Sequence, residues 1–336
     1  MISSLRQGLA RPLSRLVTLL CLCAVAGTPA AAQELAWPQK PVRLVVSYAA
    51  GNVTDVLARI VADQLTGKWG QAVVVDNKPG LGGSLGAQLA AKAPNDGYTL
   101  LFSAMAALAI NPHVYPNVGY NPVKDFAPII NVASPEVLVV VPASLNIQTF
   151  AQLLAWSKAN PSAVSYGSAG NGTVPHLNIE TLKIGTGLIA QHVPYKAANA
   201  ALTDLVAGRI QLQSDAMSVL MPQVSAGKLV AIMALTSNGK RHPQLPNVPT
   251  MMEVAPGLQP VITWLGMLAP AGTAPAIVTR TARDVAQILT QREVQEKFVT
   301  AGLTIQGEGP EAFARTIAAD VERLGKLARD INLKMD

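Results

Sequence analysis

The feature that most constrains the fold of this sequence is a repeated alternation between short β-branched runs and longer segments with helical periodicity. Residues 42–48 (VRLVVSY) predict a buried strand, and apolar residues from Val56 to Leu65 recur at helical spacing after it. The alternation continues to about residue 235, and the remainder is mostly helical. This order of elements is typical of an α/β fold in which helices connect the strands of a parallel sheet.

The same patterns predict the other elements along the chain. Further strands are expected at 72–75, 98–103, 137–141, 164–166, 189–193, 210–214 and 229–235, with another apolar run at 264–268. Further helices are expected at 84–93, 149–159, from about 173, 199–207, 217–226, 275–290, 293–301 and 310–330. Two successive α/β units and a helical tail indicate two lobes, with crossing points near Pro128 and Pro135 and again between Pro243 and Pro260.

The first 32 residues have the pattern of a secretory signal peptide. Three arginines, with no acidic residue among them, precede an apolar run at 16–26, and Ala30-Ala31-Ala32 forms a small-residue cleavage site. The apolar run is shorter than the roughly 20 residues that span a bilayer, which argues against an uncleaved anchor. We therefore expect an exported, periplasmic protein.

Composition then excludes several classes of function. Both cysteines, Cys21 and Cys23, lie in the predicted signal peptide, so thiolate chemistry and zinc–cysteine sites are excluded for the rest of the chain. After residue 32 there are 23 basic and 20 acidic residues, and aromatic residues make up only 4% of the sequence. This balance argues against a nucleic-acid partner.

A possible nucleophile occurs in residues 82–86 (GGSLG), which match the pattern G-x-S-x-G around Ser84. A nucleophile elbow needs its serine on a sharp turn directly after a strand, but the preceding strand is predicted to end near residue 75. We therefore favour a serine that begins a helix, and keep a secreted serine hydrolase as an alternative.

The remaining chemistry-bearing residues predict neither a metal nor a cofactor. The four histidines, His113, His176, His192 and His242, lack the spacing of a metal site, and His176, early in a predicted helix, is expected to be packed or solvated rather than to face a ligand cleft. Residues 167–173 (GSAGNGT) are rich in glycine but lack the lysine of a phosphate-binding loop.

Small or polar residues join several strands to the helices that follow, at 48–52, 103–107 and 167–173. Backbone N–H groups at such junctions can bind an anion, because the first turn of a helix leaves them without partners. The same residues are also ordinary connections of an α/β fold, and spacing alone does not decide between the two interpretations.

Seven segments in order give the sequence a resemblance to the Bug family, the periplasmic solute receptors of tripartite tricarboxylate transporters. They are residues 37–43 (WPQKPVR), 76–83 (DNKPGLGG), 96–100 (DGYTL), 168–173 (SAGNGT), 192–196 (HVPYK), 245–250 (LPNVPT) and 268–273 (LAPAGT).

The resemblance implies a type II periplasmic binding fold, in which two α/β lobes joined by a hinge close on a ligand in the cleft between them. It implies lobe 1 at 33–130 plus 255–336 and lobe 2 at 131–254. It also implies a monomeric receptor, not an enzyme, that takes a small organic acid and delivers it to integral membrane transporter subunits. A sensing or scaffold module that binds no metabolite is a further alternative.

Two loops depart from the family pattern. The first family loop reads A-P-G-G-x-x-D, and here Ala50 replaces the proline and Asn52 replaces the second glycine. After Ser103, residues 104–106 (AMA) stand where the family often has Thr-Gly-Thr. Near Asp215, Ser214 replaces a family phenylalanine, and Asp215 is expected either to accept a hydrogen bond from a ligand or to cap the next helix.

The predicted ligand-binding residues all lie where strands end. They are Tyr48, Ala50, Gly51, Asn52, Ser103, Ala104, Ser168, Gly170, Asn171, Thr173 and Asp215, with Ala50, Gly51, Ala104 and Gly170 contributing backbone amides.

Overall fold

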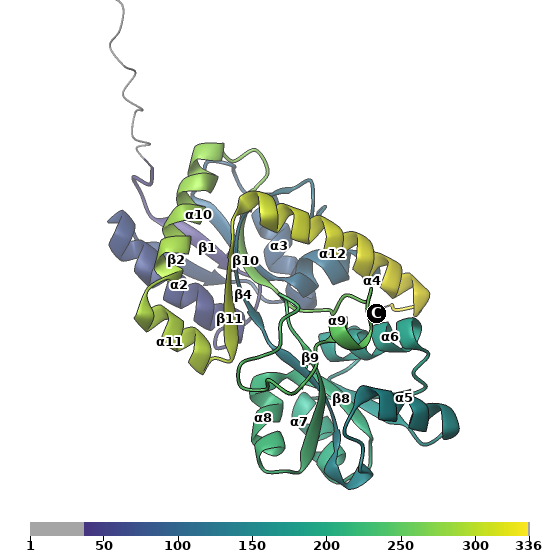
Figure 1. The fold of residues 1–336 in the computed structure, drawn as a ribbon. Helices are drawn as coiled ribbons and strands as arrows, with labels where there is room; N and C mark the ends of the chain where they lie inside the picture. The colour runs from purple at the N-terminus through teal and green to yellow at the C-terminus, as the bar shows by residue number, and fades with distance from the viewer. Residues whose placement is uncertain (1–36, 335–336) are drawn as a thin grey trace, which may run out of the picture. The chain divides into compact units, whose positions relative to one another are not determined.

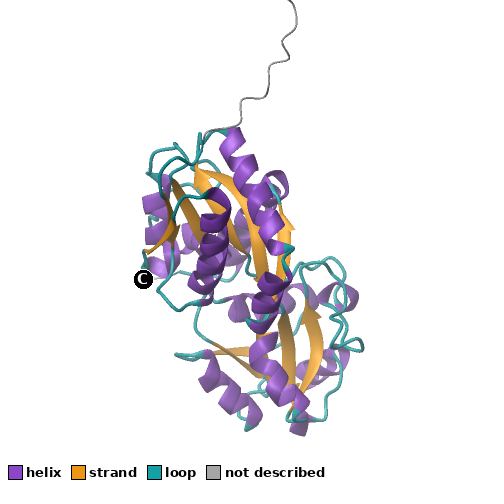
Figure 2. Cartoon of the chain, turned by 90° about the vertical axis from the view of Figure 1, so that its left-hand side faces the viewer, coloured by secondary structure: helices purple, strands orange, loops and turns teal. Residues whose placement is uncertain are grey.

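The computed structural model describes residues 37–334, so the predicted signal peptide lies outside the described residues. The strands form two mixed sheets, which appear as two separate groups flanked by helices (Figure 1, Figure 2). The first sheet has the order β11–β4–β10–β3–β1–β2 and the second β7–β6–β8–β5–β9. The strands are β1 (Val42–Val46), β2 (Val73–Asn77), β3 (Thr99–Ala104), β4 (Phe126–Pro135), β5 (Val137–Pro142), β6 (Ser165–Ser168), β7 (Gln191–Pro194), β8 (Leu212–Ala216), β9 (Leu229–Leu235), β10 (Leu265–Pro270) and β11 (Leu303–Glu308).

Most of the helices fall close to the predicted positions, but the short helices at Asn111–Val114 and Met251–Val254 were not predicted. The helices are α2 (Val53–Trp69), α3 (Ser84–Ala91), α4 (Asn111–Val114), α5 (Phe150–Ala159), α6 (Val174–Thr186), α7 (Ala198–Val206), α8 (Met217–Ser225), α9 (Met251–Val254), α10 (Pro275–Leu289), α11 (Arg292–Thr300) and α12 (Pro310–Asp330). Short 3₁₀ turns at Leu81–Gly83 and Ala143–Leu145 and a π-helical turn at Ala106–Ile110 complete the list. None of the helices in the described part of the chain is long and apolar enough to cross a membrane.

Local sequence explains how α2 begins and ends. The Asn52 side chain accepts a hydrogen bond from the Thr54 N–H, which satisfies one of the unpaired donors of the first turn. At the other end Gly70 adopts a left-handed conformation (φ 66°) and donates its N–H to Thr66. Glycine has no Cβ to oppose that conformation, so it closes the helix without strain.

Both sheets are mixed, whereas the sequence predicted parallel strands. Strands β4, β10 and β11 run antiparallel to their neighbours in the first sheet, and β5 runs antiparallel to β8 and β9 in the second. Strands β4 and β11 were not predicted. The prolines of β4, Pro128 and Pro135, look in the sequence like residues that end a strand. In the structure the register between β4 and β10 shifts between Ile130 and Pro128, and this irregularity accommodates a proline inside the strand.

Strand β5 separates two apolar clusters of the second sheet. Val137, Val139 and Val141 belong to one cluster, whereas Leu138 and Val140 belong to the other. Side chains alternate between the faces of a strand, so a continuous apolar run is buried on both sides. A third cluster covers the first sheet, and α12 contributes Phe313 and other apolar residues to it.

A single residue, Glu136, separates β4 of the first sheet from β5 of the second. Its carbonyl accepts the N–H of Met217 at the start of α8 (2.7 Å), and its carboxylate accepts the Thr304 hydroxyl of β11 (3.0 Å). We call this residue the Glu136 joint. The return connection is the longer segment 236–264, in which Val261 exchanges two hydrogen bonds with the Asn178 side chain of α6 (2.9 and 2.8 Å).

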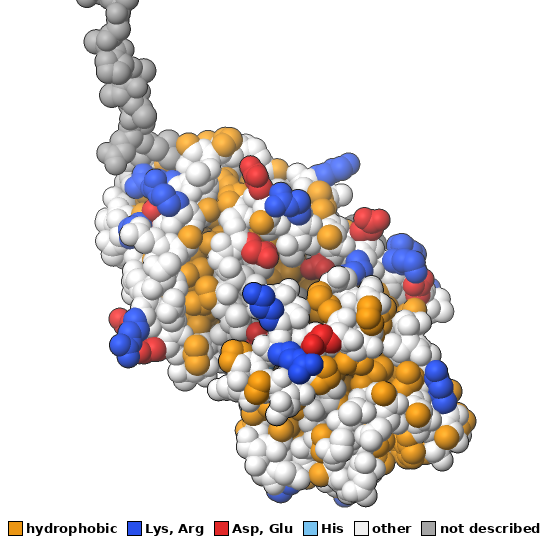
Figure 3. Space-filling view, in the orientation of Figure 1, with side chains coloured by type: hydrophobic (Ala, Val, Ile, Leu, Met, Phe, Trp, Pro, Cys, Tyr) orange, Lys and Arg blue, Asp and Glu red, His pale blue; other side chains and the backbone are white. Residues whose placement is uncertain are grey.

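Charges of both signs are interspersed on the face shown in Figure 3, rather than gathered in one patch. Ion pairs such as Arg292–Glu296 (2.8 Å) and Arg241–Glu253 (2.9 Å) show the same short-range alternation. Exposed pairs of this kind contribute little to stability, so the two sheets depend mainly on their apolar clusters.

Candidate functional site

Strand register gathers the predicted loops of the first sheet at one edge. Val46 of β1 lies beside Phe102 of β3, and both strands run in the same direction. Leu265 of β10 lies opposite Ala104 on one side and Ala133 of β4 on the other. The carboxyl ends of β1, β3 and β4 therefore share the edge that leads to the Glu136 joint.

The second sheet presents the same kind of edge to the joint. Strands β6, β7 and β8 are parallel, and Val137, directly after Glu136, lies opposite Ala216 at the carboxyl end of β8. The predicted residues thus form two groups, one at each sheet edge nearest the joint. Within residues 37–334 no hydrogen bond connects the groups.

The buried carboxylate of Asp55 organises the first group. It accepts the Gly51 N–H (2.8 Å) and the Arg59 Nε–H (3.0 Å), and its other oxygen accepts the Asn77 amide (2.9 Å). The same amide donates to the Tyr48 carbonyl (3.0 Å). Burial alone would raise the pKa of Asp55, but the hydrogen bonds from Arg59, Gly51 and Asn77 outweigh it and lower that pKa.

These contacts decide which backbone donors remain available in the first loop. The Gly51 N–H, predicted to face a ligand, is used by Asp55, and the Asn52 side chain is used by Thr54. In the described chain no intramolecular acceptor takes the N–H of Ala50 or Val53. The Ala50 amide, predicted to contact a ligand, therefore has no intramolecular acceptor, and Val53 supplies a second such donor that the sequence did not single out.

The other residues of the first group are directed inward. The Ser103 hydroxyl is buried and hydrogen-bonded to Ser47 (2.8 Å), and Ala104 lies within β3. The ring end of Tyr48 lies against Gly83, where an added Cβ would come within 2.9 Å of it. Burial, followed by the nearby Tyr120, raises the pKa of Tyr48 above its ordinary value. Glycine at position 83 thus makes room for the Tyr48 ring.

Hydrogen bonds within the loop that follows β6 shape the second group. The Ser168 hydroxyl accepts the Gly170 N–H (3.1 Å) and lies 3.0 Å from the Gly170 carbonyl. The Thr173 hydroxyl donates to the same carbonyl (2.7 Å). The Gly170 amide, predicted as a free donor, is therefore engaged inside the loop. Asn171 is exposed, and no hydrogen bond of its side chain is found in the described residues.

Two histidines that the sequence did not assign to the site lie beside this loop. His192 Nε2 is 2.7 Å from the Ser168 hydroxyl, and His176 Nδ1 accepts the Gly172 N–H (3.1 Å). Their rings stack with centroids 4.2 Å apart. Histidine spacing in the chain gives no sign of this, because His176 lies on α6 and His192 on β7, and only the sheet brings them together.

Asp215 does not cap α8. The N-cap of that helix is Ala216, without a side-chain cap, and the Asp215 carboxylate accepts the Ala216 N–H (2.8 Å) and the Gln213 amide (3.1 Å). Burial raises the pKa of Asp215. No ion pair of the described residues includes it, so its carboxylate lacks a positive partner inside the chain.

Ser84 does not have the surroundings of a nucleophile. Its hydroxyl is buried at the start of α3 and accepts the Asn111 amide (2.9 Å), with the Tyr120 hydroxyl at 3.3 Å. Val73–Asn77, the preceding strand, is separated from it by a 3₁₀ turn. The geometry is that of a helix start, and the hydrolase alternative gains no support.

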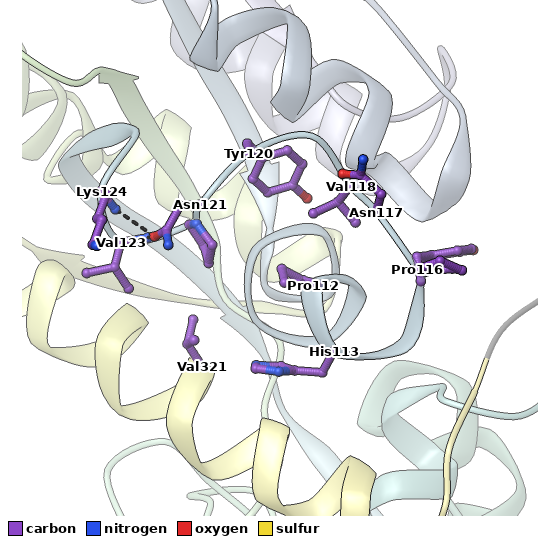
Figure 4. Close-up of a pocket in the computed structure, with 12 residues that line it drawn as sticks. Pro112, His113, Pro116, Asn117, Val118, Tyr120, Asn121, Val123, Lys124 and Val321 are labelled. Atoms are coloured by element: carbon purple, nitrogen blue, oxygen red, sulfur yellow. Dashed lines mark hydrogen bonds between the residues drawn. The ribbon is translucent and has the colours of Figure 1, made fainter.

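The described surface also has hollows away from the predicted residues. One, of about 460 Å³, lies between residues 112–124 and Val321 of α12, and the Asn121 side chain accepts the Lys124 N–H beside it (Figure 4). Another, of about 340 Å³, is lined by Asn131, Trp264 and residues of the return segment. None of the predicted ligand-binding residues lines either hollow.

Comparison with known proteins decides the family. The model of the tripartite tricarboxylate transporter family receptor matches residues 57–333. Protein BugT of Bordetella pertussis is 31% identical over 313 residues, which cover 93% of this chain and 95% of that protein. The chain belongs to the Bug family of tripartite tricarboxylate transporter receptors.

Two solved structures show that the fold of this Bug-family receptor is that of a two-lobed solute-binding protein. R. palustris Rpa4515 with adipate has a TM-score of 0.70 and 34% identity, covering 89% of this chain and 99% of that one. MatC (Rpa3494) from Rhodopseudomonas palustris with bound malate has a TM-score of 0.66 and 26% identity, covering 87% and 99%. The predicted type II α/β fold and receptor role are confirmed.

We expect this Bug-family receptor to lose stability as the pH falls from 7 to 5. Burial and the neighbouring His192 lower the pKa of His176 from 6.5 to about 4. In this range the unfolded chain binds more protons at His176 than the folded chain, so acid favours unfolding. His176 alone should account for about 2 kcal/mol of the free energy of unfolding.

Urea denaturation at pH 7 and pH 5 measures this difference. In a His176→Asn variant the loss between the two pH values should be smaller by about the same amount. An equal loss in both proteins would show that His176 is not the group responsible.

Proposed function

We propose that this receptor works in the periplasm, where it captures a small organic carboxylate between two lobes and delivers it to the membrane subunits of a tripartite transporter. One observation carries the proposal. The loops after β1 and β3 and the loops after β6 and β8 end at the two sheet edges on either side of the Glu136 joint. Rotation about a hinge at that joint would close the two groups of residues on one ligand.

The sheets support a proposal about the lobes. Predicted lobe 1 combines 33–130 with 255–336, and predicted lobe 2 is 131–254. Because β4 stays in the first sheet as far as Pro135, we place the first crossing at Glu136. The second crossing lies in the return segment 236–264. We also propose that the receptor is monomeric and has no catalytic activity, and that it uses no cofactor.

The chemistry of the two groups favours an anion with a polar or protonated substituent. Free amides of Ala50 and Val53, at the start of α2, suit a carboxylate. Asp215, which has no positive partner in the described chain, suits a hydroxyl, an ammonium or a protonated carboxyl group. The relatives that bind adipate and malate support a carboxylate of this size.

The test combines native mass spectrometry of the purified receptor with calorimetry against adipate, malate and amino-dicarboxylates. We expect one acid to bind and, at about 100 times its dissociation constant, to stabilise the fold by about 2.7 kcal/mol. Asn171→Ala should weaken binding, whereas Asn247→Ala, an exposed asparagine outside both groups, should not. If no acid binds, or both variants behave alike, the proposed site is wrong.

A further inference from the structure

The loop after β6 is held from two sides by histidines of other elements. His192 of β7 lies 2.7 Å from the Ser168 hydroxyl, which in turn accepts the Gly170 N–H. His176 of α6 accepts the Gly172 N–H at Nδ1. The two imidazoles therefore contact both ends of the Ser168–Gly172 stretch and fix the direction of its backbone.

The two rings are stacked on each other, His176 buried and His192 half-buried. Their centroids are 4.2 Å apart and their planes differ by 24°, and the Tyr166 ring lies 4.8 Å from His192 on the same stack. His176 is 7% exposed. A charge on either ring would be poorly solvated, and charges on both would repel each other at short range.

The hydrogen bond from Gly172 fixes the protonation of His176. A backbone N–H can donate only to a nitrogen that carries a lone pair, so Nδ1 is unprotonated and the ring is the neutral Nε2–H form. A proton added to Nδ1 would oppose the Gly172 N–H and break this contact. His192 differs, because a protonated His192 could still donate to the Ser168 hydroxyl.

Among the charged neighbours, Glu180 favours a cation at His176, but burial and His192 oppose it more strongly. Glu180 and Lys183 of α6 and Tyr166 of β6 are the titratable groups that face the pair. The Glu180 carboxylate accepts the Tyr166 hydroxyl (2.5 Å) and pairs with Lys183 (2.7 Å), so its charge is already engaged. Burial, followed by His192, accordingly lowers the pKa of His176 to about 4.

We propose that His176 and His192 are positioning residues, and that they hold the Ser168–Gly172 loop in its present shape only while His176 is neutral. Protonation of His176 Nδ1 releases the Gly172 end of the loop. That this loop contacts a ligand rests on the proposed function, but its dependence on His176 does not.

The test uses the receptor without ligand, so that a negative result counts against this proposal alone and not against the proposed function. Nuclear magnetic resonance should follow the amides of Gly170 and Gly172 from pH 7.5 to pH 4. We expect the Gly172 resonance to titrate with a midpoint well below 6.5, and its protection from hydrogen exchange to fall about tenfold. A Gly172 amide that does not titrate would overturn the proposal.

Two variants separate positioning from a merely structural role. His176→Asn keeps an acceptor near Nδ1 but cannot titrate, so the Gly172 resonance should become independent of pH. The matched control is His242→Asn, because His242 Nδ1 also accepts a backbone N–H, from Gln244 (3.2 Å), outside the cluster. It should leave the Gly172 titration unchanged, and a titration that survives in His176→Asn would contradict the proposal.

A direct measurement covers the case in which His176→Asn does not fold. Long-range proton–nitrogen correlation in the unaltered receptor at pH 7 distinguishes the two neutral forms of each imidazole. We expect the Nε2–H form at His176. A proton on Nδ1 of His176 at pH 7 would overturn the proposal.

Discussion

Replacing Trp264 with alanine should lower the free energy of unfolding by about 3–5 kcal/mol. The Trp264 side chain is 2% exposed, packs edge-on against Phe313 at 5.0 Å, and donates its indole N–H to Asp320 (3.0 Å). Its backbone carbonyl accepts the Met105 N–H (3.0 Å), at the carboxyl end of β3. The cavity that Trp264→Ala leaves would therefore lie beside the first group of loop residues.

Urea denaturation measures this loss of stability, and two further variants serve as comparisons. Trp264→Phe keeps an aromatic ring in the cluster but loses the bond to Asp320 and part of the indole volume, so it should cost less than the alanine change, about 1–2 kcal/mol. Trp156→Ala makes the same change as the main variant at a half-buried position on α5, and should cost less than Trp264→Ala. Equal losses at positions 156 and 264 would contradict the central role of Trp264.

Replacing Asp55 with alanine should cost about 2–4 kcal/mol and disorder the first loop. The change leaves the Gly51 N–H without its acceptor, removes one of the two acceptors of the Asn77 amide, and removes the carboxylate partner of Arg59. Arg59 is half exposed, so water can solvate it and the loss stays below that of a fully buried ion pair. Faster hydrogen exchange at Gly51 should accompany the loss of stability.

Asp63→Ala is the matched control, because Asp63 is an exposed carboxylate on the same helix. It should change stability by less than about 0.5 kcal/mol and leave exchange at Gly51 unaltered. If the two aspartate variants exchange at the same rate at Gly51, the carboxylate of Asp55 does not hold the loop.

Periodicity was sufficient to predict most elements but not how the strands are arranged. β9 and α12 have the predicted bounds, because apolar patterns report burial and helix ends carry local signals. β4 was missed because its prolines are read as breakers, and the register shift that accommodates Pro128 depends on β10, far along the chain. Antiparallel pairing of β10 likewise depends on long-range contacts that no local pattern records.

The candidate site was predictable at the level of loops, and much less so at the level of atoms. The junctions between each strand and the helix after it identified both groups of residues, because the order of elements determines at which end of a sheet such junctions lie. The Asp55 carboxylate and the Ser168 hydroxyl determine which backbone amides stay free, because they accept the N–H groups of Gly51 and Gly170. The direction of these two side chains cannot be read from the sequence. The His176–His192 stack is a product of the second sheet, so no linear spacing could predict it.

The Glu136 joint limits how the length of this chain can change. Strands β4 and β5 are both buried, and only one residue separates their ladders. Inserting or deleting a residue there would move every later side chain of one strand to the opposite face, unless the extra residue bulged outward. Natural variation in length should therefore collect in the segment 236–264, and a domain graft or circular permutation of this receptor should be made there rather than at position 136.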